Sequence, residues 1–291
     1  MSGAAGAFHK GIAGISMTAA GLSYPFIDPV LWRIGPIDIP WDGQIGPIEL
    51  RWYGLTYVVG FVVGYAVIRS ELRRKGGPIP VEAADDFLFY LILGLLIGGR
   101  LGYALIYNLG AYLSAPWEVL AVWHGGMSFH GGLIGMVVAG WIFGRRREAL
   151  FLDLADIGAL AAPIGLMLGR IGNFVNGELY GRVTDVPWGI VFPQAGDLPR
   201  HPSQLYEALL EGPVLFGLLW GLRTRIRRPG EVLASFLMLY GLFRFVVEFF
   251  REPDVQIGFI MSWLTMGQIL CVFMMIAGIV LLTYLRRVQA R

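Results

Sequence analysis

The chain has few charged residues and only one cysteine. Asp, Glu, Lys and Arg make up 15% of its 291 residues, whereas an ordinary soluble domain carries about 25%. Cys271 cannot form a disulfide within the chain, and we interpret it as a small buried apolar residue. No zinc-type spacing, phosphate-binding loop or dinucleotide fingerprint occurs. The sequence therefore argues against a disulfide framework, a zinc site and a nucleotide-binding motif.

Apolar residues, in contrast, are abundant and come in long runs. They make up 56% of the chain, and the mean hydropathy is +0.62. Runs of about 20 apolar residues are long enough to cross a bilayer as helices. The 41 glycines, several spaced as Gly-x-x-x-Gly, favour close helix packing. We therefore predict an all-α, polytopic membrane protein. A soluble protein with a very large core is the alternative.

The apolar runs predict seven transmembrane helices. These cover approximately residues 52–70, 87–107, 127–144, 154–174, 203–222, 231–250 and 259–285. The five prolines of residues 22–51 exclude a spanning helix there, and the tryptophans of this segment favour the membrane interface. Residues 175–201 are polar and rich in proline and glycine, so we expect a small cap outside the bilayer.

The seven spans belong to one membrane domain, residues 22–285, with a flexible extension at 1–21 and a basic tail at 286–291. Fourteen Lys and Arg residues follow the first, third, fifth and seventh spans, six lie on the opposite side, and three lie within spans. Because cytoplasmic loops carry the excess of basic residues, we expect the N-terminus outside and the C-terminus in the cytoplasm.

This topology places polar residues from six helices in the outer half of the membrane. The group comprises Tyr53, Arg100, His130, Arg170, His201, Gln204, Glu207 and Arg244. A charged side chain at the bilayer centre costs at least about 2.5–3.5 kcal/mol, so three arginines at one depth need partners. Arg244 could pair with Glu248, and Arg170 with Glu178 or Glu207. The functional alternative is an anion site, because guanidinium groups bind phosphate through two hydrogen bonds.

The stretch Gly169–Gly181 concentrates further polar groups. Asn173 and Asn176 are three residues apart and share a face if the helix continues. They could bind headgroup hydroxyls or satisfy broken backbone. His130 is followed by two glycines that leave its imidazole uncrowded, so it could act as a general base or be a hydrogen-bonded structural histidine.

Several blocks resemble one family, the bacterial prolipoprotein diacylglyceryl transferases. Gly169–Gly181 is similar to the signature of that family. The other similar blocks, in the same order as in the family, are Arg51–Leu55, Gly98–Tyr103, Gly125–Gly132, Arg200–Glu207 and Tyr240–Asp254. The resemblance covers residues 22–285.

The resemblance implies a bacterial inner-membrane enzyme. It would move the diacylglyceryl group of phosphatidylglycerol to the lipobox cysteine of a prolipoprotein, releasing glycerol phosphate. His130, with Tyr53 near it, would form the thiolate, and Arg170 and Arg244 would bind the phosphate. The remaining expected site residues are Asn173, Glu178 and Arg100 at the headgroup, with Asn176, Gln204, Glu207 and Glu248 in support. The expected partners are phosphatidylglycerol, the prolipoprotein signal peptide and membrane lipids, with no nucleic acid. No cofactor or metal is implied.

Three other functions stay open at this point. Buried charges also mark transport pathways, although the polar groups lie in the outer half and no inverted repeat is visible. A phosphatidylglycerol-using transferase with a sugar or alcohol acceptor would need no cysteine in its acceptor. A lipid-binding scaffold would carry no base beside the anion site.

Overall fold

A computed structural model describes residues 17–18, 21–25, 27–39, 43–74, 77–121, 124–225, 228–253, 259–260 and 264–288. Most of the expected N-terminal extension, and the last three residues of the expected basic tail, lie outside this described part. The chain divides into two compact units. Unit 1 comprises Met1–Val62, Ala162–Gly221 and Ser235–Val280, and unit 2 comprises Val63–Ala161, Leu222–Ala234 and Leu281–Arg291.

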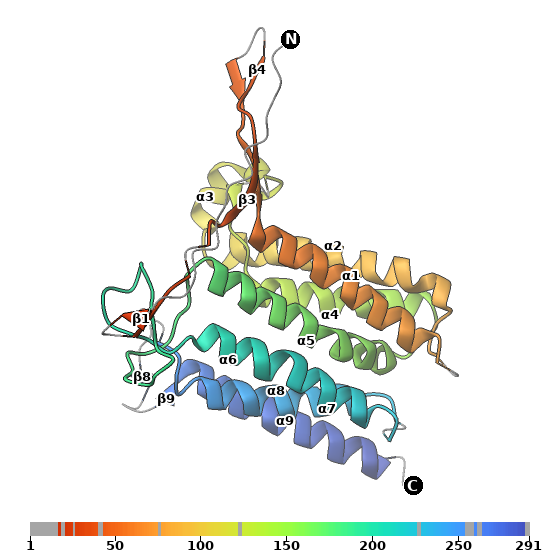
Figure 1. Cartoon of the computed structure of the whole chain (residues 1–291). Helices are drawn as coiled ribbons and strands as arrows, with labels where there is room; N and C mark the ends of the chain where they lie inside the picture. Colours follow the sequence, from red (N-terminus) through yellow and green to blue (C-terminus); the bar gives the residue numbers. More distant parts are fainter. Residues whose placement is uncertain are drawn as a thin grey trace. The chain divides into compact units, whose positions relative to one another are not determined.

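The described chain is mostly helical, as predicted (Figure 1). The helices are α1 (Trp52–Leu72), α2 (Ala84–Ile106), α3 (Leu109–Ser114), α4 (Phe129–Arg146), α5 (Phe151–Val175), α6 (Ser203–Leu209), α7 (Leu215–Leu222), α8 (Glu231–Val247) and α9 (Met266–Val288). Short turns are η1 (Val81–Ala83), η2 (Pro116–Val119) and the π turn η4 (Leu210–Val214).

Five stretches of the described residues are long and apolar enough to cross a membrane. They are Trp52–Leu72, Val81–Ile106, Phe151–Val175, Ser203–Leu222 and Met266–Val288. The chain therefore has the helices of a multi-pass membrane protein. At the two other predicted spans lie α4, with 18 residues, and α8, with 17.

Short strands, which the sequence analysis did not predict, accompany the helices. They are β1 (Met17–Thr18), β2 (Gly21–Ser23), β3 (Val30–Ile34), β4 (Ile37–Ile39), β5 (Gly43–Ile45), β6 (Ile48–Arg51), β7 (Ile190–Val191), β8 (Phe259–Ile260) and β9 (Leu264–Thr265). The proline-rich segment before α1 forms antiparallel pairs, β3 with β6 and β4 with β5. This ribbon leads directly into α1 (Figure 1).

The β3–β6 pair is amphipathic. Trp32 lies opposite Leu50, and Arg33 lies opposite Glu49. Because neighbouring strand residues point to opposite faces, the apolar pair and the charged pair occupy different faces. Glu49 also contacts Arg51 at 2.8 Å, so the charged face is ion-paired.

The predicted seventh span begins too early. We expected it at residue 259, but α9 begins at Met266. A reciprocal capping interaction sets this start: the Gln268 backbone N–H donates to Thr265 Oγ1 at 3.2 Å, and the Thr265 N–H donates to Gln268 Oε1 at 3.0 Å. Phe259–Ile260 instead pairs with Leu264–Thr265 as β8 and β9.

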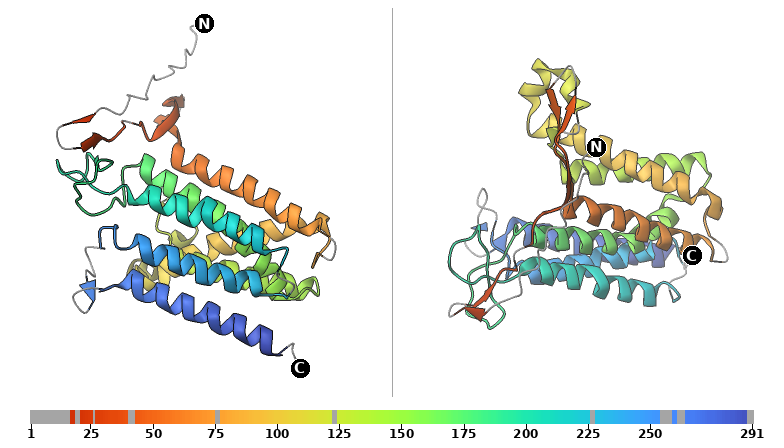
Figure 2. Two further views of the ribbon diagram at one scale, coloured as in Figure 1. Left: turned by 60° about the horizontal axis from the view of Figure 1, so that its bottom comes forward. Right: turned by 45° about the horizontal axis from the view of Figure 1, so that its top comes forward.

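In unit 2, glycines set the contact between α2 and α4. A Cβ on Gly98 would lie 2.3 Å from the Gly131 carbonyl oxygen, and one on Gly94 would lie 2.4 Å from that of Gly135. No larger side chain fits at that separation, so the Gly94/Gly98 and Gly131/Gly135 spacings serve packing, as interpreted from the sequence, whereas a Cβ on Gly64 would meet nothing within 4 Å. The two helices run side by side in both views of Figure 2.

In unit 1, the N-terminal strands hold the end of α5. β2 pairs in parallel with β7, which belongs to the long connection between α5 and α6. The Tyr24 hydroxyl donates to the carbonyls of Phe174 at 2.7 Å and Val175 at 2.8 Å. Burial raises the pKa of Tyr24, so its hydroxyl keeps the proton that it donates. The last turn of α5 therefore has a partner for carbonyls that the helix leaves unsatisfied.

Candidate functional site

Two arginines of unit 1 meet at one carboxylate oxygen. Arg170 on α5 places Nε 2.6 Å from Oε2 of Glu207 on α6. Arg244 on α8 places Nη1 2.5 Å from the same oxygen. The Glu207 side chain is fully buried, whereas those of Arg170 and Arg244 keep 21% and 12% of their surface exposed. The carboxylate therefore holds the guanidinium groups together, and each of them retains some accessible surface.

Glu248 fixes the other side of Arg244. Its Oε2 lies 2.9 Å from Nη2 of Arg244, one helical turn earlier. Its Oε1 accepts a hydrogen bond from the Thr265 hydroxyl at 3.1 Å and lies 3.7 Å from Nη1 of Arg251. Arg244 is therefore held between two carboxylates. The sequence-based pairing of Arg244 with Glu248 and of Arg170 with Glu207 is confirmed by these ion pairs.

The two asparagines after Arg170 hold Glu178. Asn173 and Asn176 both donate through Nδ2 to Glu178 Oε1, at 2.9 and 3.2 Å. Gly177 has φ +68°, a conformation that glycine adopts without strain, and it turns the chain so that Glu178 points back to α5. Gln204 donates to the Glu178 carbonyl at 2.7 Å. Asn173 Oδ1 lies 3.5 Å from Nη1 of Arg170, which joins this network to the arginine pair.

Tyr53 lies against the same stretch of α5. A Cβ on Gly172 would lie 2.8 Å from Cδ2 of Tyr53, so the ring packs directly on the helix backbone between Arg170 and Asn173. The Tyr53 hydroxyl is 3.1 Å from that of Tyr57. The predicted residues of unit 1 thus form one connected cluster.

Sequence reasoning missed Glu211, which joins this cluster from η4. Its side chain is fully buried, and its Oε1 lies 3.9 Å from Nη1 of Arg244. A signal was present, because Glu211 is four residues after Glu207 within a predicted span, and residues at that spacing share a helix face.

His201 lies just before α6, beside exposed aromatic side chains. The Trp188 indole donates to the Tyr206 hydroxyl at 2.7 Å, and that hydroxyl lies 3.1 Å from Nδ1 of His201. Burial lowers the pKa of His201, although the charge of Asp185 opposes this effect in part. His201 therefore belongs to a local hydrogen-bonded chain with Tyr206 and Trp188.

His130 belongs to unit 2 and is the second residue of α4. The hydroxyl of Ser128 caps this helix by accepting the Gly131 N–H at 3.2 Å. The imidazole is exposed, and its ring contacts Phe129 edge-on, with centroids 5.6 Å apart. An imidazole at a helix start that the rest of the chain leaves uncovered has the freedom that a general base needs.

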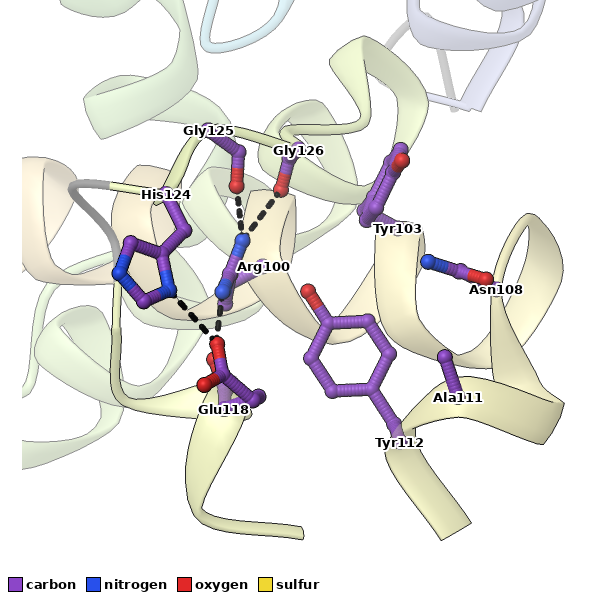
Figure 3. Close-up of a pocket in the computed structure, with 9 residues that line it drawn as sticks. All are labelled: Arg100, Tyr103, Asn108, Ala111, Tyr112, Glu118, His124, Gly125 and Gly126. Atoms are coloured by element: carbon purple, nitrogen blue, oxygen red, sulfur yellow. Dashed lines mark hydrogen bonds and ion pairs between the residues drawn. The ribbon is translucent and has the colours of Figure 1, made fainter. Parts of the chain in front are cut away.

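Arg100, also in unit 2, has its guanidinium engaged by backbone. It donates to the carbonyls of Glu118 at 2.5 Å, Ala121 at 2.9 Å, Val119 at 3.0 Å and Gly126 at 3.1 Å, and also to that of Gly125. Figure 3 shows Arg100 between the Gly125–Gly126 turn and Glu118. This arginine therefore orders the connection between α3 and α4.

A cavity of about 220 Å³ adjoins Arg100 (Figure 3). Its lining includes Tyr103, Asn108 and Tyr112. The Arg100 guanidinium lies 5.3 Å from the Tyr112 ring centroid, and His124 Nδ1 is 2.7 Å from Glu118 Oε2. The Arg100 donors already bind carbonyls, and the other polar side chains that line the cavity are those of Tyr103, Asn108, Tyr112, Glu118 and His124.

The arrangement in unit 1 suits an anion. Within the described ranges, no group of three His, Cys, Asp or Glu side chains is placed to hold a metal ion. Two guanidinium groups with accessible surface, fixed by buried carboxylates, can bind a phosphate and stabilise charge that develops on it.

Comparison with known proteins gives one family. Residues 40–284 match the family model described as prolipoprotein diacylglyceryl transferase. A relative from Geobacter sulfurreducens, named phosphatidylglycerol–prolipoprotein diacylglyceryl transferase, is 51% identical over 266 residues, which are 91% of this chain and 98% of the relative. Relatives of the same name from Nitratidesulfovibrio vulgaris and Coxiella burnetii are each 49% identical, over 90% and 88% of this chain and 95% of their own length.

Substitution of Glu207 by Gln tests whether the carboxylate holds the two arginines. Loss of its charge leaves two partly buried guanidinium groups facing each other, so we expect the free energy of unfolding to fall by about 3 kcal/mol. Denaturant titration of the detergent-solubilised protein measures this value. The matched control is Glu252→Gln: Glu252 pairs with Arg200 at 2.8 Å, but its side chain is 45% exposed. The control should lose less than about 1 kcal/mol, and equal losses would contradict a special role of Glu207.

Proposed function

The chain belongs to the prolipoprotein diacylglyceryl transferase family, and from this premise we propose that it transfers the diacylglyceryl group of phosphatidylglycerol to the lipobox cysteine of prolipoproteins. The products are a thioether-linked lipid on the protein and glycerol phosphate. The observation that carries the proposal within the site is the Arg170–Glu207–Arg244 ion-paired group, which offers two guanidinium groups to one phosphate.

The reaction is a displacement at the glycerol carbon that bears the phosphate. The cysteine sulfur forms a bond to this carbon, and the carbon–oxygen bond to the phosphate breaks with its electron pair leaving on oxygen. Arg170 and Arg244 bind the phosphate and stabilise this growing negative charge. Asn173 and Glu178 orient the headgroup or Arg170, while Glu248 orients Arg244. Asn176, Gln204 and Glu207 support these residues.

The nucleophile is the thiolate, whereas a cysteine of pKa about 8.5 is mostly protonated at neutral pH. His130 takes the thiol proton, and Tyr53 assists near the arginines. Arg100 is a further candidate for the headgroup, although its donors bind the α3–α4 connection. No cofactor enters this scheme, since the phosphate of the lipid is the leaving group.

The proposed topology has seven spans in a bacterial inner membrane, with α4 and α8 completing the five long helices. Seventeen helical residues extend about 26 Å, which approaches the bilayer hydrocarbon thickness of about 30 Å. The excess of basic residues after alternate spans supports an outer N-terminus and a cytoplasmic C-terminus. The catalytic residues then lie toward the outer face, where a lipobox cysteine emerges beside its signal helix.

An assay of the purified protein tests the reaction itself. The protein in detergent receives phosphatidylglycerol and either a lipobox peptide or the same peptide with Cys→Ser. We expect a thioether-linked diacylglyceryl peptide and glycerol phosphate with the cysteine peptide only, because the product bond forms at sulfur. Mass spectrometry of the peptide detects it. Phosphatidylglycerol binding without any product would contradict the transferase function and favour a lipid-binding or transport role.

Arg170→Lys tests the phosphate site. A lysine keeps the charge but loses the planar fork, so we expect kcat/KM for phosphatidylglycerol to fall by about 100-fold. Arg182→Lys is the control, because Arg182 is also a unit 1 arginine but donates to the Arg251 carbonyl at 2.9 Å. Near-normal rates for Arg170→Lys would exclude a bidentate phosphate contact at this residue.

His130→Gln tests the base. Glutamine retains hydrogen bonding but cannot take up a proton, so we expect kcat to fall by about 100-fold at neutral pH. The remaining rate should rise as pH increases, since the free thiolate then forms without a base. Single-turnover rates over a pH series measure both effects. Wild-type rates would mean that the thiolate forms without His130. His124→Gln is the matched histidine control, because His124 pairs with Glu118.

A further inference from the structure

Glu211 is a buried carboxyl group that the proposed mechanism does not use. Its side chain is fully buried, and neither of its oxygens has a hydrogen-bond partner among the described residues. Its Oε1 is 3.9 Å from Nη1 of Arg244, but that nitrogen lies 2.5 Å from Glu207. The shorter contact of Arg244 Nη1 is therefore with Glu207, and among the described residues no cation lies closer to Glu211 than the 3.9 Å of this nitrogen.

The two arginines and two carboxylates that interact with Glu211 balance one another without it, while Arg251 contacts the other oxygen of Glu248 at 3.7 Å. Arg170 and Arg244 are positive, and Glu207 and Glu248 each contact a guanidinium group at under 3 Å. The ionisable groups that face or interact with Glu211 are Arg170 of α5, Glu207 of α6, Tyr240 and Arg244 of α8, Glu248 directly after α8, and Cys271 of α9. An ionised Glu211 would add an unbalanced buried charge, which costs several kcal/mol. A neutral Glu211 avoids this cost.

The local backbone delivers Glu211 to this position. The next residue, Gly212, has non-helical dihedral angles within the π turn, and Pro213 supplies no backbone N–H. A Cβ on Gly212 would lie 2.6 Å from Cβ of Met167, so α5 approaches the turn closely. Single π turns within helices recur at functional sites. The sequence Glu-Gly-Pro thus brings a carboxyl group beside Arg244. At Gly212 the close approach of Met167 leaves little room for a side chain.

We propose that Glu211 is a positioning residue that acts as a neutral carboxylic acid beside Arg244. Its uncharged oxygen, 3.9 Å from Nη1 of Arg244, turns a dipole toward the guanidinium group without neutralising it, so the positive charge of the arginine pair stays available to the phosphodiester. An ionised Glu211 would compete with the lipid phosphate for Arg244. This role rests on the proposed function, because it assumes that the arginine pair binds a phosphate.

Infrared difference spectroscopy tests the protonation state without any substrate. The spectrum of the Glu211→Gln protein is subtracted from that of the wild-type protein at neutral pH, in H₂O and in D₂O. We expect a C=O stretching band of a protonated carboxyl group that shifts in D₂O. Glu231→Gln is the control: Glu231 is also buried, but it is ion-paired with Arg286 at 3.1 Å, so this subtraction should show a carboxylate band. A carboxylate band at Glu211 would overturn the proposal.

Kinetics test the positioning role. We expect Glu211→Ala to lower kcat by about 10-fold with little change in KM for phosphatidylglycerol, and Glu211→Gln to restore kcat, because the amide supplies a neutral polar group of the same size. An equal loss in both variants would show that the charge is required. A KM lowered by about 10-fold in Glu211→Gln would show that Glu211 is ionised in the wild-type protein, since its removal would relieve repulsion. Either result overturns the proposal.

Absence of thioether product in the wild-type protein would reject the proposed function instead, while the infrared result would still stand.

Discussion

The candidate site depends on one carboxylate oxygen, Oε2 of Glu207, which contacts two guanidinium groups. Two arginines in an apolar helical unit repel each other and lose hydration energy, so a shared anion stabilises both positions. Glu207 supplies that anion from a different helix. Two cations are therefore already brought together in the folded chain, which is the preorganised arrangement that the proposed phosphate site requires.

The rest of unit 1 serves to hold these groups at the right positions. The end of α5 carries Arg170 and Asn173, and the Tyr24 hydroxyl satisfies its last carbonyls. The positive-φ turn at Gly177 returns Glu178 to the asparagines. The capping interaction of Thr265 and Gln268 fixes the start of α9, and the same threonine hydroxyl binds Glu248. Structural devices at helix ends are thus directly connected to the charged residues.

Unit 2 uses a different principle, the absence of side chains. Its glycines let α2 and α4 approach until backbone carbonyls and Cα atoms are in contact. The start of α4, where His130 lies, follows a loop whose carbonyls bind Arg100. Arg100, which the sequence suggested as a headgroup ligand, therefore orders the connection between α3 and α4. An arginine within a predicted span can bind a substrate or order a nearby backbone segment. The sequence does not distinguish these roles, because in both of them a buried guanidinium group donates to oxygen atoms.

The sequence by itself determined the helical membrane class and most of the helix positions. A helix that crosses the bilayer needs about 20 consecutive apolar residues, and this property can be read from each segment alone. It also indicated Glu248 as a partner of Arg244 and narrowed the partner of Arg170 to Glu178 or Glu207, since few carboxylates occur within the spans. Only the tertiary structure decided that Glu207 serves both arginines through one oxygen, that Glu211 joins them and that Arg100 binds backbone. It also revealed the strands before α1 and the late start of α9. These features depend on contacts between segments far apart in the chain and on the orientation of individual side chains, and neither composition nor periodicity encodes such distances.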